Sequence, residues 1–559
     1  MPTNATESHA DGLSIKTLQQ RLASMRSMRS QVESLYDDIA RFMLDRPPSM
    51  TAGSRSASST RGQTPKDVFT KHGVNANMRL ASGLQGLVAP PEQRWLSLQV
   101  SSTAVNDVYA VRRYLDDIEE VLYSVFSSSG FYHKSLEMMT EYTAFGQGVM
   151  MVTYDPVDKV QFIAIPVREC YFDMDIQGRI NTVCRVHAVP IRSIPARFPD
   201  VMDVPEFAQK YHRDPEAMVE LQHYVLPNPR YVPGSRSPKE RRYNSVYILA
   251  EGGPLELTLE RHFYDSMPYL TPRWQVLPGE VYGRSQAMVA LSEVRMLSQL
   301  VNSTNSGLDM LLRPPLLGME GIVNGNGINY NPGGITTLNS IAGNSVDGGI
   351  RPLNTGARPD IGLQAQEGVK QGISYTMMSD MLAEAKDERM SATEASTRQM
   401  LRIASMAPQI GRVIPEYLDP LIERVLDILV ANNLLPKPPE AINGLAIEYR
   451  SPLAKAQRLQ AMDGVNMFMQ SFQMLAQSDP TGGVMDLIDM ERLVQFIALA
   501  TDAPAAILRS PEEIAQIKQQ RAEAEAQAQQ QQMAQQGSET ALNAARALQA
   551  VDSTSTEVA

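Results

Sequence analysis

The sequence predicts a mainly helical α+β fold organised around two helices that a glycine-rich insertion separates. The first predicted helix spans 284–313, repeats apolar residues at heptad spacing, and is ended by Pro314 and Pro315. The second spans 361–382 and repeats apolar residues at four-residue steps. Residues 318–356 are rich in Gly, Asn and Pro and cannot form one regular element. Together these observations predict an antiparallel stalk with a loop-rich tip.

The first helix of the stalk carries two stripes of different character. The apolar stripe consists of Ala290, Val294, Leu297, Val301, Leu308 and Leu311. The polar stripe keeps nearly the same period and consists of Ser285, Ser292, Gln299, Ser303 and Ser306. Because side chains three and four residues apart share a helix face, the stripes predict one packed side and one hydrated side.

Residues 1–283 are predicted to form one α+β region, with helices first and a sheet after them. Polar residues 1–14 are expected to be disordered. Helices are expected at 17–44, 66–88 and 108–125 and, after a break at Gly130, up to residue 145. From residue 149 the hydrophobic period changes to two, which predicts strands. Strands are expected at 95–100, 149–154, 160–165, 170–175, 182–189, 219–225, 245–250, 255–264 and 273–277.

The segment after the stalk begins with a charged cluster at 383–390. It is equally compatible with a solvated loop and with a loop that projects towards whatever occupies the polar side of the stalk. A capping box at 391–394 opens a helical stretch to about 433, which prolines interrupt. A strand near 445–449 and helices at 453–476 and 484–501 are expected next. The Ala/Gln/Glu-rich stretch 511–536 predicts a solvated helix that fades into a disordered tail.

Charge and motif content disfavour several functions. The chain has 51 basic and 62 acidic residues and a net charge of −11, whereas proteins that grip nucleic acid through its phosphates are usually basic. It has no P-loop, no CxxC and only two cysteines, so we expect no metal, no cofactor and a reducing compartment. It has no secretory h-region and no apolar run of about 18 residues, so no membrane span is expected.

Several stretches together resemble one known protein family. Residues 76–98 are ANMRLASGLQGLVAPPEQRWLSL, residues 280–300 are EVYGRSQAMVALSEVRMLSQL, and residues 390–411 are MSATEASTRQMLRIASMAPQIG. Further on stand LLPKPP and IEYRSPLAKAQR. In this order and at these distances the stretches resemble the head-to-tail connector, or portal, proteins of T7-like short-tailed bacteriophages. The resemblance covers roughly residues 15–510.

The resemblance implies a portal-like fold with wing, stem helix pair, clip and helical crown, assembled as a ring of usually twelve subunits. The implied parts are a wing over 1–283, stem helices at 284–313 and 361–382, a clip at 314–360, a tunnel loop at 383–390, a long kinked wing helix at 391–445, a crown at 446–510 and a Gln/Ala-rich helical or disordered tail at 511–559.

The resemblance also implies which residues meet DNA and partner proteins. Double-stranded DNA would pass the tunnel loop and the polar side of the stem, at Lys386, Asp387, Glu388, Arg389, Ser292, Arg295, Gln299 and Ser303. Arg295 is equally compatible with a salt bridge between subunits. The clip would dock the terminase large subunit and later the tail adaptor protein, through Asn324, Asn326, Tyr330 and Asn331.

The implied setting is the portal vertex of a virion assembled in the host cytoplasm. The further partners would be sister copies in a homo-dodecamer, the major capsid and scaffolding proteins, and internal core proteins. The chain is expected to be no enzyme, so that a separate motor hydrolyses ATP for DNA packaging.

Two alternatives stay open. One is another non-enzymatic virion protein, such as an internal-core or scaffolding protein, which would need no clip between paired helices. The other is a hydrolase with a cryptic site in 149–277, for which Cys170 and Asp173 are the candidate residues.

Overall fold

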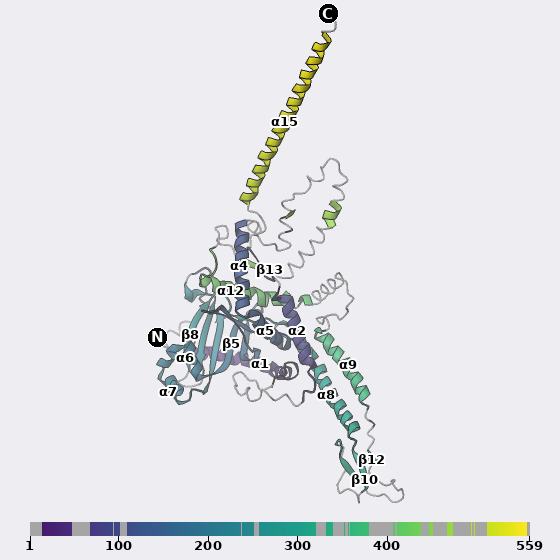
Figure 1. The fold of residues 1–559 in the computed structure, drawn as a ribbon. Helices are drawn as coiled ribbons and strands as arrows, with labels where there is room; N and C mark the ends of the chain where they lie inside the picture. The colour runs from purple at the N-terminus through teal and green to yellow at the C-terminus, as the bar shows by residue number, and fades with distance from the viewer. Residues whose placement is uncertain are drawn as a thin grey trace. The chain divides into compact units, whose positions relative to one another are not determined.

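The computed structural model places part of the chain in detail (Figure 1). It describes residues 14–46, 67–92, 94–100, 109–235, 237–250, 256–319, 331–338, 351–352, 356, 358–379, 406–408, 411–437, 447–450, 467–472, 493–494, 497 and 511–555. Contacts divide the chain into two compact units. The first unit comprises Met1–Trp95 and Leu122–Leu435, and the second comprises Leu96–Val121 and Pro436–Ala559.

This division differs from the single region expected over 1–283. In the second unit, β1 (Ser97–Val100) pairs antiparallel with β13 (Ile447–Arg450), so residues far apart in sequence share one small sheet. Both strands were predicted, but a strand's own period carries no information about its partner, so the pairing was not.

The first unit contains a five-stranded antiparallel sheet in the order β4-β5-β6-β7-β8 (Figure 1). Its strands are β4 (Cys170–Met174), β5 (Ile180–Pro190), β6 (Met218–Pro227), β7 (Tyr243–Leu249) and β8 (Leu257–Tyr264). Helix α1 (Ile15–Met43) packs Leu18, Leu22 and Met25 on one face. The other face is covered by the short helices α6 (Ile194–Arg197) and α7 (Pro205–Arg213), which the sequence analysis did not predict.

A smaller sheet has the order β3-β2-β9 and consists of β2 (Met150–Asp155), β3 (Lys159–Ala164) and β9 (Tyr269–Leu270). The strand predicted at 273–277 is wrong, because this stretch makes only isolated bridges at Arg273 and Gln275. The Arg273 N–H donates to the Glu416 carboxylate at 2.8 Å, so the backbone there is bonded to a side chain and not to a continuous ladder.

Between α1 and the small sheet, the described residues form the helices α2 (His72–Val88), α4 (Tyr109–Ser128) and α5 (Phe131–Phe145). The predicted break at Gly130 is confirmed, since Gly130 adopts the left-handed φ of 67° that glycine tolerates. Helix α2 begins at His72, later than the predicted residue 66. Ahead of it, the Phe69 N–H donates to the side chain of Ser298, which lies in the first helix of the predicted stalk.

The two helices of the predicted stalk are confirmed as α8 (Gln286–Leu312) and α9 (Pro359–Thr376). Helix α9 ends before the predicted residue 382, because Met378 takes a left-handed φ of 53° and the chain turns. Between the helices the structure describes three short strands that were not predicted. They form a sheet in the order β11-β10-β12, with β10 (Leu316–Met319), β11 (Ile335–Leu338) and β12 (Arg351–Pro352).

The helical stretch after residue 405 is interrupted, as its prolines predicted. A π-helical turn at Ile414–Leu418 contains Pro415, and α12 (Asp419–Ala431) starts with Pro420 in its first turn. Only a few residues of the helices predicted at 453–476 and 484–501 are described, and residues 467–472 are helical.

The C-terminal helix α15 (Pro511–Ser555) extends well past the predicted end at residue 536. Its Ala, Gln and Glu residues favour helix at nearly every position, and the expected disordered tail is helical to Ser555. Across the described residues, no helix combines the length and the apolar character needed to span a bilayer.

Candidate functional site

The α8–α9 pair is fixed at its base by a close crossing of two backbone segments. A Cβ atom on Gly283 would lie 2.1 Å from the Gly146 carbonyl oxygen, so only glycine fits there. The hydroxyl of Ser285 caps α8, since it accepts from the Met288 N–H at 3.1 Å and donates to the Ala144 carbonyl at 2.6 Å. The first turn of α8 is therefore tied to the end of α5.

The predicted apolar stripe is buried only along the first half of α8. Ala290, Val294 and Leu297 are fully buried, whereas Leu308 and Leu311 are exposed in the single chain. Beside the buried part, the Ser298 hydroxyl donates to the Asp67 carbonyl at 3.0 Å and also accepts from the segment ahead of α2. The base half of α8 thus belongs to the core of the first unit, and the far half extends beyond it.

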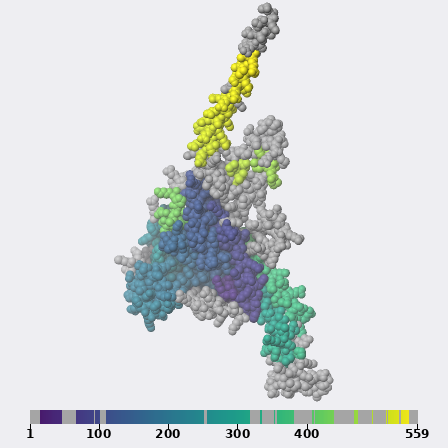
Figure 2. Space-filling model, viewed as in Figure 1, coloured from purple at the N-terminus to yellow at the C-terminus, as the bar shows by residue number. Residues whose placement is uncertain are grey.

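Helix α9 returns antiparallel along α8, and small residues allow a close approach. A Cβ atom on Gly362 would lie 2.5 Å from the Thr304 hydroxyl oxygen, and one on Gly372 would lie 3.3 Å from the Glu293 carboxylate. Figure 1 shows the two helices side by side, and the space-filling view shows them as a narrow column coloured teal to green (Figure 2). Near the base, His72 Nε2 is 3.2 Å from the Lys370 carbonyl.

The polar side of α8 is exposed, as the stripe predicted. Ser292, Gln299 and Ser303 all face solvent in the single chain, about half a turn away from the buried face. Ser285, which the stripe also contained, is instead buried as the helix cap. A row of hydroxyl and amide groups therefore follows the side of α8 that lies opposite its buried side.

Arg295 has a partner that neither hypothesis from the sequence contained. Its guanidinium forms an ion pair with Asp38 of α1 and lies 5.8 Å from the centre of the Phe42 ring. It is therefore engaged within its own chain. The sequence could not indicate this, because Asp38 and Arg295 meet only when α1 packs beside α8.

Most of the other residues predicted to be functional lie outside the described part of the chain. These are Lys386, Asp387, Glu388, Arg389, Asn324, Asn326 and Tyr330. Asn331 is described; it is exposed, and its carbonyl accepts from the Gly334 N–H at 2.8 Å.

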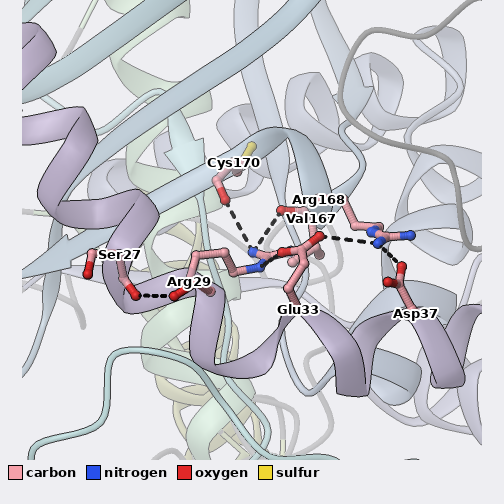
Figure 3. Close-up of polar contacts among 8 residues, drawn as sticks. Ser27, Arg29, Glu33, Asp37, Val167, Arg168 and Cys170 are labelled. Atoms are coloured by element: carbon pink, nitrogen blue, oxygen red, sulfur yellow. Dashed lines mark hydrogen bonds and ion pairs between the residues drawn. The ribbon is translucent and has the colours of Figure 1, made fainter.

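A polar network that the sequence analysis missed holds α1 against the sheet (Figure 3). The buried Arg29 donates to Glu33 at 3.1 Å and to the carbonyls of Val167 and Cys170 at 3.4 Å. Arg168 donates to Glu33 at 3.2 Å and pairs with Asp37. Asp37 pairs with Arg168, which lies just before β4, and its neighbour Asp38 pairs with Arg295 of α8. Helix α1 therefore connects this edge of the sheet to α8.

The residues considered for a hydrolase do not form an accessible site. Cys170 is fully buried, and burial raises the pKa of its thiol, which disfavours the reactive thiolate. Asp173 is exposed and caps its own backbone through a bond from the Met174 N–H at 2.9 Å. In the described part of the chain, no group of three or more His, Cys, Asp or Glu residues is arranged to hold a metal ion.

The arrangement nearest to a catalytic one is a buried chain of hydrogen bonds that joins β6 and β7 of the five-stranded sheet to β9 of the smaller sheet. His223 Nε2 is 2.7 Å from the Ser245 hydroxyl, and Nδ1 is 2.6 Å from the Tyr269 hydroxyl. Burial lowers the pKa of His223 well below its ordinary value, so the ring is neutral. His223 is 1% exposed and Ser245 is 0% exposed, so no substrate reaches them, and the chain of bonds is part of the packing.

The described fold thus combines a column of two paired helices, exposed along one polar side, with a sheet that helices cover on both faces. Residues 15–508 match the family described as "Bacteriophage head to tail connecting protein". The chain belongs to this family, whose members are structural components of the phage virion, and the resemblance found in the sequence is confirmed.

The proteins similar to the chain include two curated relatives and a chain of a solved structure. The "Probable portal protein" of Bordetella phage BPP-1 is 27% identical over 537 residues, which cover 94% of each chain. The "Portal protein" of Salmonella phage epsilon15 is 25% identical over 538 residues, also covering 94% of each. A chain of the structure titled "Virion of native gene transfer agent (GTA) particle" aligns with 74% of this chain and 90% of its own length, at 12% identity and a TM-score of 0.32.

Proposed function

We propose that this chain forms a dodecameric ring at one capsid vertex, and that double-stranded DNA passes through the ring during packaging and ejection. The observation that carries the proposal is the exposed polar side of α8 at Ser292, Gln299 and Ser303. Hydroxyl and amide groups can hydrate a passing polyanion without gripping its phosphates. With a net charge of −11 on each copy, a channel would repel DNA overall and leave its movement to a separate motor.

The proposed parts follow the family pattern. Helices α8 and α9 would form the stem, and the sheet of β10, β11 and β12 would belong to the clip that docks the terminase and then the tail adaptor. The tunnel loop at 383–390 would face the channel. The wing and crown would meet the capsid, scaffolding and internal core proteins.

A ring can close only through a head-to-tail interface, in which two different surfaces of each subunit meet. The α8–α9 pair offers apolar side chains for such contacts that the single chain leaves exposed. These are Val289, Met296, Leu308, Leu311, Leu312, Ile361, Leu363 and Tyr375. Exposed apolar residues concentrated on one projecting element are typical of an interaction surface. We infer that neighbouring subunits cover them.

Electron microscopy of the purified protein tests the ring. We expect particles with an axial hole, and a reconstruction in which Ser292, Gln299 and Ser303 face that hole. Filaments or monomers at working concentration would overturn the proposal, and so would burial of these three residues between subunits.

The proposed tunnel loop is tested separately by replacing Lys386 and Arg389 with alanine. Rings should still assemble, because neither residue belongs to the exposed apolar surface, but the amount of DNA packaged should fall at least tenfold. Replacing Lys210 and Arg213 on α7 by alanine removes the same charge elsewhere and should leave packaging unchanged. Loss of assembly in the first variant would show instead that the cluster is a subunit interface.

A further inference from the structure

A second surface of unusual character lies at one end of the five-stranded sheet. The loop 228–242 joins β6 to β7, and the turn 175–179 joins β4 to β5. Strand β5 pairs with β6 so that Val183 lies opposite Val225, and Pro227 lies opposite Tyr243. The loop and the turn therefore lie at the same end of the sheet. We call them together the basic edge.

The loop of the basic edge is held in one conformation by the buried side chain of Asn228. Its amide donates to the Lys239 carbonyl at 2.8 Å and to the Arg241 carbonyl at 2.7 Å, and its oxygen accepts from the Arg230 N–H at 3.1 Å. The Val232 N–H closes the loop further by donating to the Glu240 carbonyl at 3.1 Å. Because these bonds already fix the ends of the loop at 228–232 and 239–241, a partner would not have to meet the entropic cost of ordering them.

The basic edge combines exposed apolar side chains with positive charge. Tyr231 is 44% exposed, Val232 is 51% exposed, and Ile176 at the neighbouring turn is fully exposed. Across 175–179 and 228–242 the sequence has six basic and two acidic residues, although the whole chain carries −11. Lys239 and Arg242 are among the exposed bases, whereas Arg241 is paired with Asp265 at 3.4 Å.

We propose that the basic edge docks an acidic segment of another protein, and that this segment inserts an apolar side chain among Tyr231, Val232 and Ile176. An apolar centre with Tyr, surrounded by Arg and Lys, is the arrangement found at protein interfaces. Nucleic acid fits less well. Its phosphates would contact the Lys and Arg side chains but would gain nothing from the exposed Val and Ile side chains. The proposal does not depend on the ring or the channel.

The test places a photo-crosslinking amino acid, p-benzoylphenylalanine, at Val232 of the full chain, supplied from a plasmid in infected cells. After irradiation, mass spectrometry identifies the crosslinked peptides. We expect a peptide of a different protein with net negative charge. The same amino acid at Arg213, which precedes the opposite end of β6, is the matched control and should not capture that peptide.

The proposal is overturned if the crosslinks at Val232 are no more abundant than those at Arg213. It is also overturned if the only crosslinked partner is DNA, a segment without acidic residues, or a second copy of this chain. A charge test follows in the crosslinking chain. Lys239→Glu with Arg242→Glu should lower the yield at least tenfold, while Lys210→Glu with Arg213→Glu should not. Thermal unfolding of both double variants checks that the sheet stays folded, and an unchanged yield in the first also overturns the proposal.

Discussion

The five-stranded sheet and the α8–α9 pair complete their packing in different ways. All seven residues of β7, which lies between β6 and β8, are buried within one chain, because helices cover both faces of the sheet. In α9, by contrast, Gln366 and Ile373 are the residues described as buried, and apolar side chains such as Leu363 and Tyr375 face outward. The sheet therefore completes its packing within one chain, whereas the pair leaves apolar side chains exposed, as the proposed ring interface requires. The predictions below test this difference, and the close crossing of Gly146 and Gly283 that ties the start of α8 to the end of α5.

The largest effect is expected at that crossing. Replacing Gly283 by alanine places a methyl group against the Gly146 carbonyl, and two backbones cannot both keep their positions. We expect a loss of about 3–5 kcal/mol in the free energy of unfolding. Gly86→Ala in α2 is the control, since no atom lies within 4 Å of its Cβ position, and it should be neutral or stabilise by up to about 1 kcal/mol. Urea unfolding of both variants measures the difference, and equal midpoints would show that the crossing is not close.

A smaller effect of pH is expected from the sheet alone. Burial lowers the pKa of His223 well below 6.5 and that of His187 to about 3. Below pH 6.5 the unfolded chain therefore binds protons that the folded sheet does not bind. Stability should fall as the pH drops from 6.5, by up to about 1.4 kcal/mol per pH unit for each histidine, and these groups contribute nothing above that pH.

The measurement is urea unfolding between pH 7.5 and 5.0, for the wild type and for His223→Gln. Glutamine can still bond with Ser245 and Tyr269 but does not titrate, so the variant should depend less steeply on pH. Acids such as Asp419, whose pKa is raised by partial desolvation and by Glu423, act in the opposite direction in both proteins and cancel in the comparison. Parallel curves would contradict the assignment to His223.

The smallest effect is expected within the α8–α9 pair. Gly362→Ala presses a methyl group against the Thr304 side chain, which can shift by rotating, so we expect a loss of about 1–3 kcal/mol. Gly368→Ala in the same helix meets no atom within 4 Å and should be neutral or slightly stabilising in the single chain. Thermal unfolding compares the two variants. If Gly368→Ala is instead the variant that prevents assembly, its face of α9 is buried by a neighbouring subunit, which would sharpen the contrast with the sheet.

The features of the site that depend on α8 alone could be predicted from the sequence, whereas those that depend on other elements could not. The exposure of Ser292, Gln299 and Ser303 could be predicted because residues at this spacing share one side of a helix. The ion pair of Arg295 with Asp38 could not, since it depends on where α1 packs. Leu308 shows the same limit of a periodic pattern: it repeats with Val294 but is exposed, because burial depends on what lies beside the helix.

The sequence alone determined the local elements and the family. Periodic apolar residues, Gly130 and the prolines acted within a few residues of one another, which is why the helices and most strands could be predicted. Only the tertiary structure decided which distant residues meet. Examples are the pairing of β1 with β13 and the bonds of Arg273 in place of a strand. The ion pairs by which α1 connects the sheet to α8, and the formation of the basic edge, are further examples. The physical reason is that a helix or strand fixes only its own periodicity, whereas a partner is chosen by packing, which involves the whole folded chain.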